Sequence, residues 1–116
     1  MVQTREAVGF VAFLIGAAAL TAVNHHPTHG RHTERERLAV EAVTSQFTHE
    51  QIADAWTHAK VGNPQPLLAI EHAFPLQAQT VHEAGAGILF TFIGHGETCI
   101  DFLSVPDGRS VTARDC

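Results

Sequence analysis

The sequence predicts an α+β fold: an N-terminal transmembrane helix, then two amphipathic helices packed on a three- to four-stranded antiparallel β-meander. Three observations support this prediction. Residues 7–23 carry no charge, apolar residues then recur at helical spacing as far as residue 60, and the period changes to two after Leu76. Because 116 residues leave room for one domain, we expect an anchor at 1–24, a His-rich juxtamembrane linker at 25–32 and the domain at 33–116.

The apolar segment Ala7–Val23 is the first feature that needs an interpretation. As a helix its 17 residues rise about 25 Å, close to the ~30 Å of a bilayer's hydrocarbon core. We interpret it as an uncleaved transmembrane or signal-anchor helix that holds the chain in the lipid bilayer. Two alternatives stay open: a signal peptide cleaved after Ala19, which would leave a secreted domain, and a buried core helix, which would need a polar stripe that this run lacks.

Two signals disagree about the side of the membrane on which the domain lies. One arginine, Arg5, precedes the segment and three follow it at positions 31, 35 and 37, which favours a cytoplasmic domain under the positive-inside rule. The two cysteines, Cys99 and Cys116, favour an oxidising compartment. We give the cysteines more weight, because a specific strand pairing brings them together, and expect a single-pass cell-membrane protein with its C-terminal domain outside the cytoplasm.

The first helix of the domain is predicted to begin after Thr33. Thr33 and Glu36 form a capping box, whereas Pro27 and Gly30 argue against a helix through the preceding linker. This helix carries the apolar residues Leu38, Val40, Val43 and Phe47.

A second helix opens with another capping box, formed by Thr48 and Gln51, and is expected to end near Lys60 with Gly62 as its terminator. After it, Pro66 at a first helical position favours a further short helix. The apolar residues of the second helix recur at i, i+3, i+4 and i+7, as Ile52, Ala55, Trp56 and Ala59.

Four strands follow, each bounded by residues that favour turns. Their short connections imply an antiparallel meander. The predicted strands are Gln77–His82, Gly87–Ile93, Thr98–Leu103 and Ser110–Asp115.

The register of the last hairpin predicts two specific pairs. A two-residue turn at positions 107 and 108 places Cys99 opposite Cys116 and Asp101 opposite Arg114, which gives a disulfide and a cross-strand ion pair. The alternative, a three-residue loop at 106–108, would place Cys99 opposite Asp115 and separate both pairs. We favour the first alignment.

The preceding hairpin predicts which strand residues form the core. A loop at 94–96, with Gly96 at positive φ, places Phe90 opposite Ile100 and Ile88 opposite Phe102. The predicted core consists of Ile88, Phe90, Phe92, Ile100 and Phe102 against Leu38, Val43, Phe47, Ile52 and Trp56.

The residues near Cys99 could also support chemistry. Cys99, His95 and Asp101 are residue types that can act as nucleophile, base and orienting acid. We favour the disulfide, because Cys116 is available and His95 lies in a turn, and we expect no catalysis. A zinc site made by Cys99, Cys116, His95 and His82 is the alternative in a reducing compartment.

A cluster of histidines precedes the domain. His25, His26, His29 and His32 are candidate metal ligands, because imidazoles at such spacing can bind zinc or copper. No acidic or cysteine side chain lies inside the tract to complete a site. We therefore predict a solvated linker without a metal or cofactor, and keep a His-rich metal-binding envelope protein as an alternative.

The net charge and the order of the predicted elements indicate which class of partner the chain binds. A net charge of −5 and the absence of tyrosine argue against nucleic-acid binding. The order of parts resembles type IV pilins and pseudopilins in outline, although Leu14 stands where that family has glutamate; the resemblance implies a filament subunit. We expect a structural, assembly or protein-binding subunit of a cell-envelope complex that contacts another envelope protein or itself, with the pilin-like filament subunit as the alternative.

Overall fold

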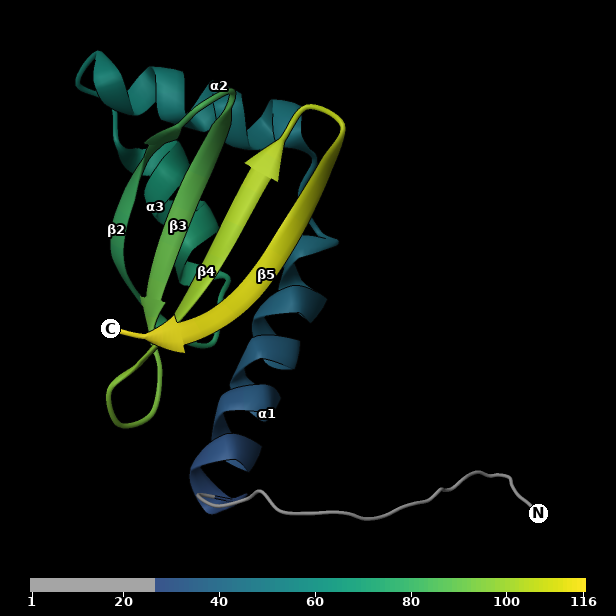
Figure 1. The fold of residues 1–116 in the computed structure, drawn as a ribbon. Helices are drawn as coiled ribbons and strands as arrows, with labels where there is room; N and C mark the ends of the chain where they lie inside the picture. The colour runs from purple at the N-terminus through teal and green to yellow at the C-terminus, as the bar shows by residue number, and fades with distance from the viewer. Residues whose placement is uncertain (1–26) are drawn as a thin grey trace. The chain divides into compact units, whose positions relative to one another are not determined.

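The computed structural model describes residues 27–116, in which three helices precede a four-stranded antiparallel sheet. This is the α+β arrangement that the sequence predicts, and its third helix is the further short helix that Pro66 favours (Figure 1). The predicted membrane segment Ala7–Val23 lies outside these residues, and within 27–116 no helix combines the length and apolarity needed to cross a bilayer. The elements are α1 (Pro27–Thr44), α2 (His49–Lys60), α3 (Gln65–His72), β2 (Gln77–Ala84), β3 (Gly87–Ile93), β4 (Thr98–Val105) and β5 (Gly108–Asp115).

Helix α2 begins and ends where the sequence predicts. The Gln51 backbone N–H donates to the Thr48 hydroxyl over 3.1 Å, and the Thr48 N–H donates to the Gln51 side-chain oxygen over 2.8 Å. This reciprocal capping box satisfies two amide groups that the helix leaves without partners. Beyond the other end, Gly62 has a φ of 97°, which favours glycine. Pro66 lies in the first turn of α3, as expected.

Helix α1 begins at Pro27, so the predicted start after Thr33 and the predicted irregular segment at 27–32 are wrong. Proline is tolerated in the first helical turn, because its missing N–H would have no acceptor there. A single interior glycine such as Gly30 costs only about 1 kcal/mol relative to alanine. Pro27 and Gly30, which argue against a helix in the sequence, are therefore both accommodated in α1.

The four strands pair in the order β2-β3-β4-β5, so that β2 and β5 form the two edges of the sheet. The β2–β3 pairing contains an irregularity between Ala78 and Thr80, where a β-bulge shifts the register. Gly85, with a φ of 61°, makes the tight turn between these two strands. The strands agree with the predicted ones, and β2, β4 and β5 each extend further into their turns.

The predicted register of the β4–β5 hairpin is wrong by two residues. Val105 lies opposite Gly108, so the turn consists of Pro106 and Asp107. Proline favours the first central position of a turn because its φ is already set, and this explains why the turn lies one residue earlier than expected. Cys99 therefore faces Arg114 instead of Cys116, and Asp101 faces Thr112. The alternative alignment of Cys99 with Asp115 is also wrong.

The β3–β4 register also differs from the prediction by two residues, but in the opposite direction, because the loop lies one residue later than expected. The Gly94 N–H donates to the Thr98 carbonyl over 2.8 Å, so the ladder includes Gly94 and the loop consists of residues 95–97. Gly96 lies at the centre of this loop with a φ of 67°, the positive value that the sequence predicts for it. Phe90 consequently faces Phe102, where the prediction placed Ile100.

These register shifts leave the sides of the sheet unchanged, because moving by two residues returns each side chain to its own face. All five predicted strand residues of the core are buried, as is Ile52 of α2, while Val43, Phe47 and Trp56 pack against the core from the side. Leu38 is wrongly predicted: it is 49% exposed, whereas Val40 is fully buried. The buried residues that the prediction omitted include Val40, Leu67, Ile70, Phe74 and Val111.

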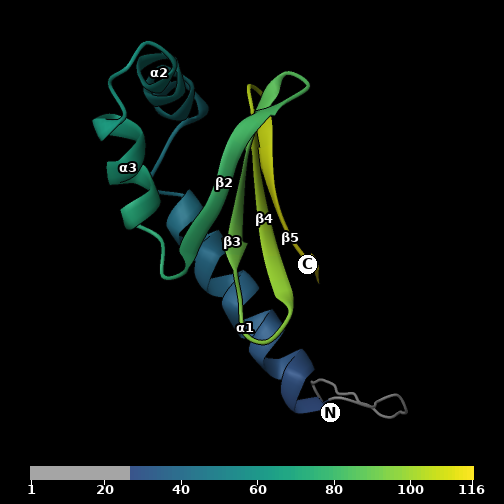
Figure 2. The ribbon, with the colours of Figure 1, turned by 90° about the vertical axis from the view of Figure 1, so that its left-hand side faces the viewer.

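Phe74, after the end of α3, lies at the centre of an aromatic cluster. Its ring centroid lies 4.7 Å from that of Phe92, 5.7 Å from that of Phe102 and 6.1 Å from that of Phe90. Such offset or tilted ring contacts add to the free energy of burial. This cluster fixes the helices on one side of the sheet, as the view along its edge shows for α2 and α3 (Figure 2).

Candidate functional site

The sheet has one face that no described helix covers, which we call the outer face (Figure 2). Alternation along β3 and β4 places apolar side chains here as well as in the core. Ile93 is 41% exposed, and Leu89, Leu103 and Val105 are partly exposed. Apolar side chains gathered on a solvent-facing sheet are typical of a protein-interaction surface. The prediction assigned Leu89, Ile93 and Leu103 to strands but not to a site, and its third strand ended before Val105.

A glycine brings part of this apolar surface together. A Cβ atom at Gly87 would lie 2.8 Å from the Val105 Cγ1 atom and 3.0 Å from the Leu103 Cδ1 atom. The two side chains therefore lie directly over the bare backbone of Gly87. Leu89 and Leu103 are cross-strand partners, so the apolar surface continues from β4 onto β3.

The predicted disulfide joins the two cysteines at one end of the outer face. Cys99 and Cys116 are bonded with their Cα atoms 5.2 Å apart, in a diagonal position across β4 and the end of β5. The Cys99 side chain is buried and Cys116 is exposed. The Cys116 N–H also donates to the Glu97 carbonyl over 2.8 Å, which fixes the chain end on the β3–β4 loop.

Asp101 and Arg114 form an ion pair on the same face, as diagonal rather than directly opposite neighbours. The Arg114 Nε atom lies 2.6 Å from the Asp101 Oδ2 atom, and the Thr91 hydroxyl donates to Asp101 Oδ1 over 2.9 Å. The hydrogen bond to Asp101, with the attraction of its charge, raises the pKa of Arg114. This polar group separates Ile93 from the apolar side chains at the other end of the face.

The three residues that could act as nucleophile, base and orienting acid, Cys99, His95 and Asp101, make other contacts in the structure. Asp101 is bound by Arg114 and Thr91, and His95 lies in the β3–β4 loop. The zinc alternative with Cys99, Cys116, His95 and His82 is wrong, because the sulfur atoms of the two cysteines form a disulfide and cannot act as thiolate ligands. His82 belongs to β2, at the edge of the sheet away from β5.

The predicted histidine tract is only partly described. His25 and His26 lie outside the described residues, and His29 belongs to α1. The His32 ring stacks on the His95 ring with centroids 4.5 Å apart and planes inclined by 18°. Within 27–116 no group of three or more histidine, cysteine or acidic side chains is arranged to hold a metal ion.

A second histidine contact was missed by the sequence reasoning. The His49 Nδ1 atom lies 2.9 Å from the Ser104 hydroxyl oxygen, at a hollow of about 260 Å³ between the start of α2 and the β4–β5 turn. Ser104 is 3% exposed. The alternation of β4 places Ser104 on the same face as Phe102, toward the core. This alternation is the sequence signal from which a buried Ser104 hydroxyl in need of a partner could have been predicted. The contact satisfies a buried hydroxyl, and in the described chain no carboxylate hydrogen-bonds His49 to orient it as a base.

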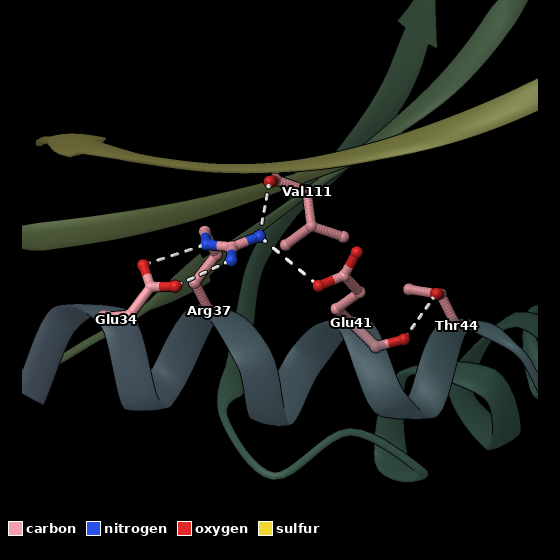
Figure 3. A network of polar contacts seen from close by, with 5 residues as sticks. All are labelled: Glu34, Arg37, Glu41, Thr44 and Val111. Atoms are coloured by element: carbon pink, nitrogen blue, oxygen red, sulfur yellow. Dashed lines mark hydrogen bonds and ion pairs between the residues drawn. The ribbon is translucent and has the colours of Figure 1, made fainter. Parts of the chain in front are cut away.

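Arg37 joins α1 to the edge of the sheet. Its guanidinium donates to both Glu34 carboxylate oxygens over 3.1 and 2.8 Å, and to the Val111 carbonyl of β5 over 3.4 Å (Figure 3). Glu41 accepts a further bond at 3.4 Å. The hydrogen bond from Arg37 lowers the pKa of Glu34. By occupying a backbone acceptor of the edge strand, Arg37 hinders the pairing of a further strand there.

Comparisons of the chain with protein-family models, curated proteins and solved structures found no match to any of them.

Proposed function

We propose that this chain is a single-span, membrane-anchored protein whose domain lies outside the cytoplasm and binds another protein of the cell envelope. The observation that carries the proposal is the uncovered outer face, where Leu89, Ile93, Leu103 and Val105 expose apolar surface to solvent. Leu89, Leu103 and Val105 adjoin one another on this face, and adjoining exposed apolar side chains favour an interaction surface.

The anchoring and the location rest on two further features. The apolar segment Ala7–Val23 supports a membrane anchor. The disulfide between Cys99 and Cys116 supports an oxidising compartment, because disulfides are rare in the cytosol. A disulfide-bonded domain anchored at a membrane suits a structural or assembly role, because the anchor raises the local concentration of the domain near its partners.

Photo-crosslinking in intact cells tests the proposed surface. A photoreactive amino acid in place of Ile93 or Leu103 is expected to give a covalent adduct heavier than the chain. The matched control is the same amino acid in place of Val61, which is 79% exposed beyond the end of α2. Equal adducts from all three positions, or an adduct from Val61 alone, would contradict the outer face as the binding surface.

A pilin-like filament subunit is the second candidate. The observation that favours it is the continuity of α1 through Gly30, because a long N-terminal helix is what the pilin resemblance implies. Electron microscopy of cells that overproduce the chain tests this candidate. Filaments that bind an antibody against the chain would support it, whereas overproduction without filaments would leave the anchored binding protein as the better proposal.

A further inference from the structure

Residues 32–37 of α1 attach to the sheet and its β3–β4 loop by polar contacts. The Glu36 carboxylate accepts a hydrogen bond from the His95 N–H over 2.9 Å, the His32 ring stacks on the His95 ring, and Arg37 binds the β5 edge. Among residues 31–44 of α1, the first fully buried apolar side chain is Val40. Residues 31–39 are therefore attached to the sheet without a buried apolar side chain of their own.

The contact between α1 and the β3–β4 loop is closely fitted. A Cβ atom at Gly94 would lie 2.8 Å from the Glu36 Oε1 atom, so the carboxylate lies close against the backbone of Gly94. Thr33 and Thr98 bring their hydroxyl oxygens to 3.5 Å beside it. We call the set of Glu36, His32 and His95 the clasp.

Two stacked imidazole rings are a pH-sensitive element. Histidine is the side chain that ordinarily changes charge between about pH 5 and 8. Two unit charges 4.5 Å apart repel enough to change an equilibrium constant about fivefold even at the dielectric constant of water. The stack is therefore compatible with no proton or one proton on the pair, and is weakened when both rings are charged.

The charged groups around the rings set the sign of the effect. Glu36 and Arg35 line the same shallow hollow as His32, while Arg31, Glu34 and Glu97 are the charged residues within two positions of the rings in the sequence. Glu34 is paired with Arg37, which offsets its charge. Glu36 and Glu97 attract a protonated ring, and Arg31 and Arg35 repel it. These four remaining groups are two acidic and two basic, so the repulsion between the two rings themselves decides the outcome.

From this geometry we infer that the clasp is a pH-dependent attachment, closed near neutral pH and released when both His32 and His95 are protonated. Release frees the N-terminal part of α1 from the β3–β4 loop and leaves Val40 in the core. The attachment itself does not depend on the proposed function. Its consequence for a membrane-anchored domain, a change in how the domain is held, does rest on that function.

Amide hydrogen exchange measured by NMR on the full-length chain in detergent micelles tests this inference. The protection factor of the His95 N–H, which binds Glu36, is expected to fall at least about fivefold between about pH 7.5 and pH 5.5, a range above the ordinary titration of glutamate. The Gly94 N–H, which binds Thr98 and not α1, is the internal control and is expected to keep its protection. Equal losses at both amides, or no loss at His95, would overturn the inference.

Variants separate the charge effect from the stacking. His32→Phe with His95→Phe keeps two stacked rings without a titratable group, and is expected to keep the His95-position amide protected at both pH values. His32→Gln leaves a single imidazole, so its protection is expected to be lower but independent of pH. His82→Phe, on β2, is the matched control and should respond like the unmodified chain. A pH response that persists in both His32 variants would contradict the clasp, whether or not the outer face binds a partner.

Discussion

The position of α1 on the sheet can be tested by two substitutions on the same helix. Val40 is fully buried and Leu38 is 49% exposed, although the two lie two residues apart. Val40→Ala removes two buried methyl groups, about 1.6 kcal/mol at ~0.8 each, and the cavity adds about 1 kcal/mol. The better helix propensity of alanine offsets about 0.5 kcal/mol, which leaves a loss of about 2 kcal/mol.

Thermal unfolding of the full-length chain in a mild detergent measures this loss, with the fluorescence of the single tryptophan, Trp56, as the probe. About 2 kcal/mol corresponds to a decrease in Tm of about 8–16 °C for a domain of this size. Leu38→Ala is expected to lower Tm by less than half as much, because half of the side chain already faces water and its removal leaves no cavity. A larger decrease for Leu38→Ala than for Val40→Ala would refute the placement of α1.

Three further results are expected from the same measurement. Replacing both cysteines by serine opens a loop whose ends are 17 residues apart. It should lower the free energy of unfolding by about 3 kcal/mol relative to the oxidised unmodified chain, and an unchanged Tm would contradict a stabilising disulfide. Gly87→Ala should cost about 1–3 kcal/mol, because its Cβ would lie 2.6 Å from the Ser104 carbonyl oxygen, whereas Gly108→Ala, with no atom within 4 Å, should change Tm little; equal effects would contradict the packing. The hydrogen bond from Trp56, and then that from Lys60, lower the pKa of Glu83, so its contribution is present above the ordinary glutamate pKa and is lost as the pH falls through the lowered value; Glu83→Gln should therefore show a shallower decrease in Tm between about pH 5 and 3, and an unchanged slope would contradict this role.

Local signals in the sequence were sufficient for most elements. The capping box of Thr48 and Gln51 and the terminator Gly62 lie within a few residues of the helix ends that they define, so they can be read without knowledge of the tertiary fold. The alternation of Phe90, Phe92, Ile100 and Phe102 likewise defines a buried face in any register that keeps the period of two.

Turn centres were harder to predict because neighbouring residues compete for the same turn positions. At the β4–β5 turn, Asp107-Gly108 is a common hairpin pair, but Pro106 takes the first central position and moves the register by two residues. The cysteines still bond, because the diagonal position keeps both on the outer face. A correct pairing of side chains was thus obtained from an incorrect register.

Contacts between distant segments were not accessible from the sequence. The inner side of α1 carries Glu36 and Arg37, whose partners lie on the β3–β4 loop and on β5. It also carries the buried Thr44, whose hydroxyl donates to the Glu41 carbonyl of the same helix. An apolar pattern alone therefore favours Leu38 for the core, although the helix turns it toward solvent. The His32–His95 stack depends in addition on α1 being helical at position 32, which the prediction denied.

The most direct test of the central claim, a disulfide-closed domain outside the cytoplasm, is thiol labelling of intact cells with a membrane-impermeant maleimide. A disulfide-bonded domain outside the cytoplasm should show no labelling when untreated, and labelling of the exposed Cys116 after an impermeant phosphine has reduced the disulfide. A chain with both cysteines replaced by serine controls for other sites. Labelling without reduction, or only after the cells are lysed, would contradict the claim.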